Sequence, residues 1–320
     1  MKPTDSSPAI QSFRDWSHDK PLAEALSRAE AGVRAKPQEA SARWLLFELL
    51  CVLGQWERAL KQLQTWAGLS KASDSTAHVM RGLIRAEQQR NEVFAGTRAP
   101  ATVMAGGVES PAWIAGLGEA LRLAAAQGEA ALQASDLARQ AALAQAPEAP
   151  GCSNLQPAFA WITDADTRLG PVCEVVLLGA YRWLPFSEIA SITKAAPMRL
   201  LDLVWSQVSI VLHGKKGDTD AVGSLGSEAG GAGGVELKGY MPMRYPVHSG
   251  ERDALLLARE TVWDDVGRTG VHARGQKMWM TDAGDMALLD LRECDFGGDP
   301  EQAAALTFKQ TDAGQGYATH

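Results

Sequence analysis

Two aspartates and an arginine, each separated by one residue, form the most enzyme-like group in the sequence. Asp164, Asp166 and Arg168 lie in the segment DADTR, and Glu174 follows inside an apolar run. Two carboxylates at this spacing on a strand would share one face, where they could bind a hard cation or transfer protons. In a turn, they would instead accept hydrogen bonds from backbone amides and pair with the arginine. DxD is a weak motif without a third ligand, so we favour the structural interpretation. A metal-dependent hydrolase using Asp164, Asp166 and Glu174 is the alternative.

Motifs for other kinds of catalysis are missing. The serines lack a G-x-S-x-G elbow, and the six histidines show neither HExxH nor HxxxH spacing. The four cysteines lie far apart, with no CxxC pair and no zinc-site spacing. The glycine-rich stretch contains no GK[ST] sequence that would hold a phosphate. The sequence therefore predicts no catalytic residue, no metal site and no cofactor.

Charged residues at half-buried positions predict internal ion pairs, because an unpaired buried charge is costly. Glu174 stands within an apolar run, and Arg244 stands between Met243 and Tyr245. We expect these charges to be structural rather than catalytic. The expected network comprises Arg168, Arg244, Arg259, Asp202, Asp290 and Glu174.

Composition and charge exclude several classes of protein. The chain has 320 residues, a formal net charge of -7 and 46% hydrophobic residues. A nucleic-acid-binding protein normally carries a basic face, so none is expected here. No apolar run could cross a bilayer, since the richest, 44–53, would span only about 15 Å as a helix. The first residues lack the apolar core of a secretory signal. These features, with the scattered cysteines, predict a cytoplasmic protein that binds no membrane.

Helices dominate the first half, residues 1–148. Residues 44–53 are apolar nearly all round, and Trp56, Ala59, Leu60 and Leu63 make an amphipathic stripe after Gly54, which predicts a helical hairpin. The Ala-Leu pairs at 25 and 59 lie 34 residues apart, the period of the tetratricopeptide repeat (TPR). Further helices are expected over 77–92 and 112–144, with an interruption at Gly128. A TPR-like domain is thus predicted, and a plain helical bundle is the alternative.

Strands dominate the second half, residues 149–320, after a segment rich in prolines and small residues at 144–157. Strands are expected at 172–178, 181–186 and 208–212, and a hairpin with a turn at 281–285. Short helices are expected within 197–204 and 251–260. Residues 216–234 are rich in glycine and predict a mobile loop, and the tail after Asp295 has little apolar content. The overall expectation is an α+β fold: a TPR-like helical domain, then a mixed, mainly antiparallel β domain with short helices.

The sequence contains ten tryptophans, most of which should be buried. Tryptophan is also enriched at interface hot spots, so one or two could anchor a partner. The candidate partner-binding residues in the helical half are Trp44, Phe47, Trp56 and Trp66, each of which could equally be core.

Several sequence blocks together resemble a known family. These are RWLLFELLCVLGQWERALKQL, DADTRLGPVCE, G-x-Y-x-W-L-P-F, DLVW, PMRYP and ARETVW, and they extend over most of the chain. The combination is similar to the ImpE/SciE/TagJ family of type VI secretion accessory proteins. Two departures are an extended amino-terminal leader and residues 216–234, which look like an insertion. The signature residues are Asp164, Asp166, Arg168, Gly170, Pro171, Glu174, Trp183, Pro185, Asp202, Trp205, Arg244, Tyr245, Arg259 and Trp263.

The resemblance implies a binding role in a contractile machine rather than catalysis. The implied partner is the small subunit of the contractile sheath, held through its amino-terminal helix. A link to the AAA+ ATPase that recycles the contracted sheath is also implied. An amphipathic helix bound in a hydrophobic groove is a common recognition mode, and an acidic receptor suits basic residues on the polar face of that helix. A scaffold that binds several proteins without a defined helix ligand is a third hypothesis.

Overall fold

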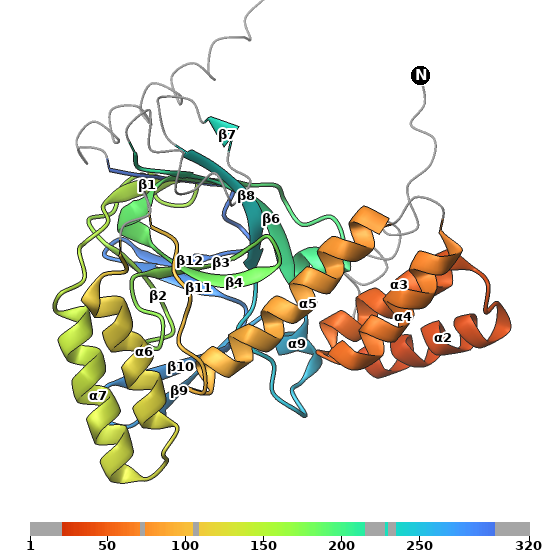
Figure 1. The fold of residues 1–320 in the computed structure, drawn as a ribbon, viewed down its shortest axis with the longest axis horizontal. Coiled ribbons are helices and arrows are strands. Elements are labelled where there is room, and N and C mark those ends of the chain that lie inside the picture. The colour runs from red at the N-terminus through yellow and green to blue at the C-terminus, as the bar shows by residue number, and fades with distance from the viewer. Residues whose placement is uncertain (1–20, 71–73, 105–108, 215–227, 230–234, 298–320) are drawn as a thin grey trace, which may run out of the picture.

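The computed structural model describes residues 21–70, 74–104, 109–214, 228–229 and 235–297 (Figure 1). The chain begins with helices and continues into strands, which confirms the expected α+β fold. The helices are α2 (Leu22–Ala35), α3 (Ala40–Val52), α4 (Trp56–Leu69), α5 (Asp74–Phe94), α6 (Ala112–Ala124) and α7 (Glu129–Leu143), with α9 (Asp253–Leu256) and the 3-10 turns η2 (Phe186–Glu188) and η3 (Leu200–Leu203) among the strands.

The helices follow from the apolar spacing. The second half of α3 is buried all round, as its continuous apolar sequence predicts, whereas α4 buries only the stripe through Ala59 and Leu63. Gly54 has a φ of +67° between these two helices, a conformation that favours glycine and ends α3. The expected helical hairpin is therefore confirmed. The expected helix over 112–144 is divided at Gly128, also as predicted.

One large antiparallel sheet forms the centre of the second half. Its strands lie in the order β1-β13-β5-β6-β8-β3-β4, with β7 beside β8. The expected strands at 172–178, 181–186 and 208–212 are present as β3, β4 and part of β6, and Pro185 is the last residue of β4. The strands of this sheet are β1 (Gly151–Ser153), β3 (Val172–Leu177), β4 (Ala180–Pro185), β5 (Ile189–Lys194), β6 (Trp205–Leu212), β7 (Glu228–Ala229), β8 (Val235–Pro242) and β13 (Glu293–Phe296).

Two smaller sheets complete the fold. Strands β11 (Met278–Thr281) and β12 (Gly284–Ala287) form the predicted hairpin, and β2 (Ile162–Asp164) pairs with β11. Strands β9 (Thr261–Val266) and β10 (Gly270–Gly275) form a separate two-stranded ribbon. The ring of Trp279, on β11, packs edge-on against that of Phe186, with ring centroids 4.9 Å apart. Both residues lie in the core of the β-rich half.

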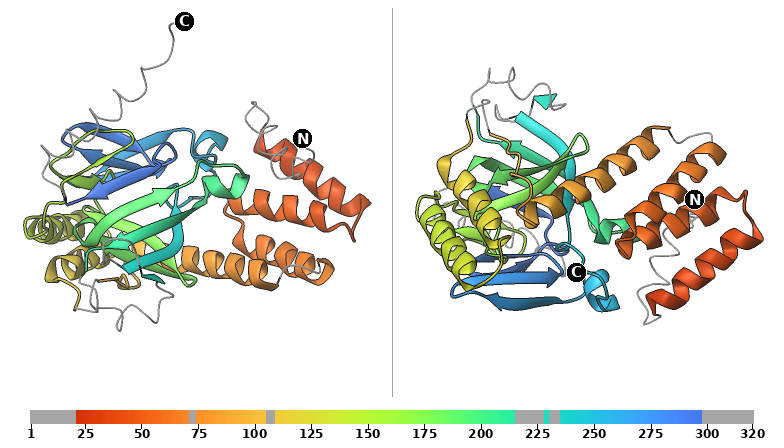
Figure 2. Two further views of the ribbon diagram at one scale, coloured as in Figure 1. Left: turned by 90° about the horizontal axis from the view of Figure 1, so that it is seen from above. Right: turned by 60° about the horizontal axis from the view of Figure 1, so that its bottom comes forward.

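Strand β3 is buried on both faces. Cys173, Val175 and Leu177 face a core made by the strands, whereas Val172 and Val176 join a second core that includes the helices. Helix α5 lies across this second face, between the sheet and the α2–α4 group (Figures 1 and 2). This double cover explains why the sequence of β3 is apolar at consecutive positions rather than at alternate ones.

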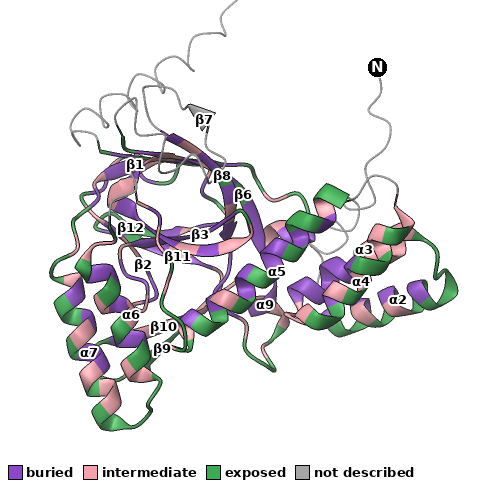
Figure 3. Cartoon of the chain, in the orientation of Figure 1, coloured by how far each residue is buried: buried purple, intermediate pink, exposed green. Residues whose placement is uncertain are grey.

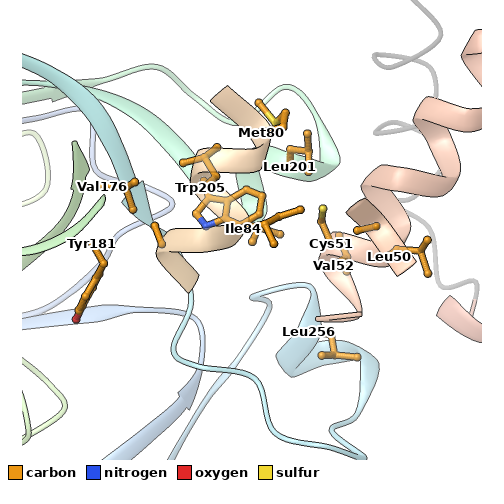
Figure 4. Packing of buried hydrophobic residues seen from close by; sticks show 14 of the residues in the cluster. Leu50, Cys51, Val52, Met80, Ile84, Val176, Tyr181, Leu201, Trp205 and Leu256 are labelled. Carbon is orange, nitrogen blue, oxygen red and sulfur yellow. The ribbon is translucent and has the colours of Figure 1, made fainter. Parts of the chain in front are cut away.

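The helical core and the sheet share buried side chains. Ile84 of α5 and Cys51 of α3 belong to the same cluster as Trp205 of β6 and Leu256 of α9 (Figure 4). Buried residues line the faces of α5 and of the sheet that meet (Figure 3). The division into domains at 148 and 149 remains a prediction, and a continuous core crosses it.

Part of the expected organisation falls outside the described residues. The amino-terminal leader and nearly all of the tail after Asp295 lie there. So does most of the predicted loop at 216–234, in which only β7 is described.

Candidate functional site

Asp164 and Asp166 begin two successive turns. Asp164, the last residue of β2, accepts a hydrogen bond at 2.9 Å from the amide of Asp166. Asp166 accepts one at 3.0 Å from the amide of Arg168 and a second, at 2.8 Å, from the Arg168 Nε. The other carboxylate oxygen of Asp166 accepts from the Ala273 amide of β10 at 2.9 Å. These bonds match the structural interpretation of the DxD sequence and join the turn to the β9–β10 ribbon.

Gly170 closes this turn. Its φ is +59°, and its carbonyl accepts a hydrogen bond at 2.8 Å from the amide of Asp164. A Cβ at this position would lie 2.6 Å from a methyl of Leu143 in α7. Glycine therefore allows both the left-handed backbone and the close approach of the helix.

Glu174 of β3 forms the centre of a buried polar cluster. The guanidinium of Arg90, on α5, binds both of its oxygens, with Nε–Oε1 at 2.7 Å and Nη2–Oε2 at 2.8 Å. The ammonium of Lys277 lies 2.6 Å from Oε2, and the hydroxyl of Tyr181 donates to Oε1 at 2.6 Å. Burial alone would raise the pKa of Glu174, but the two cations hold that pKa well below its ordinary value. Glu174 therefore remains ionised inside the protein.

Lys277 also pairs with Asp164, which accepts a further bond at 2.9 Å from the Tyr245 hydroxyl. Burial raises the pKa of Asp164 to about 6, although Lys277 opposes the shift. The two carboxylates that share Lys277 thus differ: Glu174 also faces Arg90 and keeps its charge, whereas among the described residues Asp164 pairs with Lys277 alone. The cluster extends to Glu87. The Glu87 carboxylate lies 3.6 Å from the Arg90 guanidinium and accepts a hydrogen bond from the Trp205 indole at 2.8 Å.

The cluster is unsuited to binding a metal ion. The oxygens of Glu174 and Asp166 already accept from guanidinium, ammonium, hydroxyl or amide groups, which a cation would have to displace. Within the described ranges no group of three or more His, Cys, Asp or Glu residues could hold a metal ion. What the geometry offers is a rigid connection between α5, β2, β3 and Lys277, the residue before β11, not an open site for acid–base chemistry.

Arg244 joins the two halves at a second point. Its guanidinium donates to the carbonyls of Cys51 and Val52, at 2.9 and 2.6 Å, and to that of Leu256. The first two carbonyls end α3, where a cation also interacts favourably with the helix dipole. The carbonyl of Arg244 itself accepts from Arg90 at 3.0 Å, which places both arginines in one assembly.

The membership of the expected ion network needs correction. Glu174 pairs with Arg90 and Lys277, neither of which was in the expected set. Arg168 pairs locally with Asp166, and the Asp202 carboxylate accepts from the amides of Met198 and Arg199 at the start of η3. A sequence signal for Arg90 did exist. Glu87 and Arg90 lie on the same face of α5 as Leu83 and Val93, a spacing that predicts burial.

The other signature residues have mixed environments. Trp183 and Trp205 are buried, and the indole of Trp183 donates to the Tyr181 hydroxyl at 2.7 Å. Pro171 and Pro185 lie at the matching ends of β3 and β4. Arg259 is exposed after α9, and Trp263 is exposed on β9.

The four candidate partner-binding residues lie on α3 and α4 but differ in burial. Phe47 is 0% exposed and belongs to the core. Trp44 is half-buried and packs against Trp66, with ring centroids 4.6 Å apart, and against Phe47 at 5.1 Å. Trp56 is half-buried against Trp205 at 5.6 Å. The structure thus brings Trp44, Phe47 and Trp66 together and leaves the two tryptophans partly accessible.

Comparison with known proteins identifies the family. The family model described as "ImpE protein" matches residues 156–295. The chain is 40% identical over 278 residues to the type VI secretion system accessory component TagJ of Pseudomonas aeruginosa, covering 86% of this chain and 87% of that protein. The crystal structure of protein VPA1032 from Vibrio parahaemolyticus is similar, with a TM-score of 0.70, 25% identity, and coverage of 87% of this chain and 94% of that one. None of the described helices is both long and apolar enough to cross a membrane. The sequence resemblance is thus confirmed, and the chain belongs to the ImpE family of type VI secretion accessory components.

Proposed function

We propose that the chain is a non-enzymatic adaptor of the type VI secretion system that binds the small sheath subunit through the amino-terminal helix of that subunit. The observation that carries this proposal is the 40% identity to TagJ along most of both chains. A link to the AAA+ ATPase that recycles the sheath, and a cytoplasmic location, are further parts of the proposal.

The internal carboxylates support a binding role rather than catalysis. Asp164, Asp166 and Glu174 are all buried and paired with cations, so none is available to a substrate. Their hydrogen bonds fix helix α5 and the DxD turn against the strands, which is what a rigid binding scaffold requires.

The aromatic surface of α3 and α4 is the proposed site for the sheath helix. Trp44 and Trp66 are in contact with each other and partly accessible, so they offer an aromatic surface to the apolar face of an amphipathic helix. Indole rings bury a large area at small entropic cost, which is why tryptophan is common at hot spots. The net charge of -7 belongs to the whole chain, so it would attract a helix with basic residues at long range without locating its binding site.

Calorimetric titration of the full-length chain with a peptide spanning the first helix of the sheath subunit tests the proposal. We expect saturable one-to-one binding. Replacing Trp66→Ala should weaken it at least about tenfold, as expected for a hot-spot indole. Trp263→Ala, at an exposed tryptophan on the β9–β10 ribbon, is the matched control and should bind as the unmodified chain does. No binding of the peptide or of the whole subunit would refute the adaptor function.

A further inference from the structure

One buried carboxylate in the helical half has no cation to pair with. Glu48 of α3 is 1% exposed, and its Oε1 accepts no hydrogen bond from any residue that the structure describes. Arg199, whose charge acts on Glu48, pairs instead with Asp202 at 3.6 Å. Glu48 therefore differs from Glu174 and Asp164, whose carboxylates each contact a buried cation.

Glu48 lies one helical turn from the aromatic surface proposed for the sheath helix. Residues four apart share one face of a helix, so Glu48 follows Trp44 along the same face of α3. Trp44 is half-buried and packs against Trp66, whereas Cys51, nearly one turn further along α3, is wholly buried. The carboxylate thus lies at the boundary between the partly accessible tryptophans and the core that α3 shares with the sheet.

The surroundings of Glu48 disfavour its negative charge. Burial raises its pKa to about 7; a hydrogen bond from Trp44 and the charge of Arg199 oppose the rise, and Asp202 adds to it. The titratable groups that act on Cys51, the next residue on this face, are Arg244, Glu48 and Glu87. Near neutral pH, a large fraction of the free molecules therefore keep Glu48 protonated, which avoids an unpaired buried charge. A carboxylate here gains an advantage over a neutral amide only when a positive charge reaches it.

We propose that Glu48 is the residue by which the aromatic surface selects a basic partner: it pairs with a lysine or arginine of the docked helix. This inference rests on the proposed function, and it supplies the local charge recognition that the net charge of the chain does not. The aliphatic stem of such a side chain can lie along the indole of Trp44 while its charged end reaches the carboxylate. Because Glu48 is covered in the free protein, we expect the partly accessible Trp44 to move aside as the cation enters.

Such a pair has a proton signature. A cation beside the carboxylate restores the pKa of Glu48 toward its ordinary value, so docking releases the proton that the free protein holds. With a pKa of about 7 before docking, the release should be about 0.9 protons per helix at pH 6 and less than about 0.1 at pH 8.5. Because the docked state binds fewer protons, the affinity should rise about tenfold between pH 6 and pH 8.

Calorimetry of the full-length chain with the peptide spanning the first helix of the sheath subunit measures this release. Titrations at one pH in buffers of different ionisation enthalpy give the number of protons released on binding. Glu48→Gln should abolish the release at pH 6 and weaken binding at pH 8 at least about tenfold. Glu57→Gln is the matched control, because Glu57 is exposed and lies nine residues from Trp66, on the opposite face of α4. It should release as many protons as the unmodified chain.

Peptide variants identify the side chain that pairs with Glu48. Each lysine and arginine of the peptide is replaced singly by glutamine, and each variant is titrated at pH 8 against the unmodified chain and against Glu48→Gln. One replacement should weaken binding to the unmodified chain at least about tenfold and change binding to Glu48→Gln little, because the pair is already broken there. The other replacements should affect both chains alike.

Two results would overturn the role of Glu48 and leave the adaptor function standing. They are saturable binding without proton release at pH 6, and a release that persists in Glu48→Gln. Equal effects of every peptide replacement on the two chains would also overturn it, since no single cation would then be coupled to Glu48. No binding of the peptide at either pH would refute the adaptor function itself, and the role of Glu48 with it.

Discussion

Arg90 and Glu174 join helix α5 to strand β3 through a two-point contact, with both nitrogen–oxygen distances at or below 2.8 Å. The two residues are 84 positions apart and almost wholly buried. Parallel hydrogen bonds between a guanidinium and a carboxylate fix direction as well as distance. The contact therefore sets the position of α5 on the sheet, and with it the close approach of Gly82, on α5, to Gly179 of the β3–β4 turn.

Removing one member of this pair should be costly. Arg90→Ala leaves the carboxylate of Glu174 buried with Lys277 as its one cation, and we expect a loss of about 3–5 kcal/mol in the free energy of unfolding. Urea denaturation followed by circular dichroism measures it. Arg98→Ala removes an exposed pair with Glu92 at 3.0 Å and should cost at most about 1 kcal/mol. Equal costs for the two variants would show that the buried contact does not stabilise the fold.

Glu48 should make stability depend on pH. This α3 residue is 1% exposed, and its Oε1 has no hydrogen-bond partner. Burial raises its pKa to about 7, opposed by a hydrogen bond from Trp44 and by Arg199, and reinforced by Asp202. The unfolded chain releases this proton near pH 4.3, so between about pH 4.3 and 7 the folded state binds more protons. The contribution of Glu48 to stability should therefore fall as the pH rises through that window.

The variant Glu48→Gln keeps the shape of the side chain without the charge. Its free energy of unfolding, relative to that of the unmodified chain, should rise by about 3 kcal/mol between pH 4 and pH 7 and change little above that. Glu57→Gln, at an exposed position on α4, is the control and should show no such trend. A difference that is constant across this pH range would contradict a raised pKa at Glu48.

Two helical glycines should respond oppositely to alanine. A Cβ added at Gly32 of α2 would meet no described atom within 4 Å beyond its chain neighbours and the backbone of its own helix, so Gly32→Ala should stabilise the protein by about 0.5–1 kcal/mol. Gly82→Ala gains the same helix propensity but places its methyl 2.9 Å from the Gly179 backbone. We expect net destabilisation of about 1–3 kcal/mol from the forced separation of α5 and the turn. Thermal melts of both variants test this, and stabilisation by Gly82→Ala would show that the two backbones are not in contact.

The sequence predicts the elements of this fold better than the contacts between them. The hairpin of α3 and α4 follows from local spacing, and β3 follows from a continuous apolar run. Strand β8 was missed although Val235, Leu237 and Met241 alternate along it, because glycine takes the place of the apolar residue at 239. Glu174 was correctly expected to need a cation, but Arg90 and Lys277 come from distant segments, and only the folded backbone brings them together.

Arg244 provides the last test, because it connects the halves of the chain through backbone groups rather than through a charge partner. Three buried carbonyls, two of them at the end of α3, accept from its guanidinium. Lysine keeps the positive charge but cannot reach these carbonyls in the same fork geometry, so Arg244→Lys should leave at least one unsatisfied. We expect the free energy of unfolding to fall by about 1–3 kcal/mol. The rate of amide hydrogen exchange should increase most in α3 and α9.

The pattern of that exchange distinguishes two models of the fold. Cys51 and Leu256 share a core with Trp205, so α3 and the sheet should lose protection together when the Arg244 connection is weakened. Arg274→Lys, at an arginine on β10 that is paired with Asp264 outside the core, should leave the protection of α3 unchanged. If α3 opened in the Arg244 variant while α5 and β6 kept full protection, the amino-terminal helices would be an independent folding unit. Joint loss of protection would mean that the helices and the sheet fold as one cooperative structure.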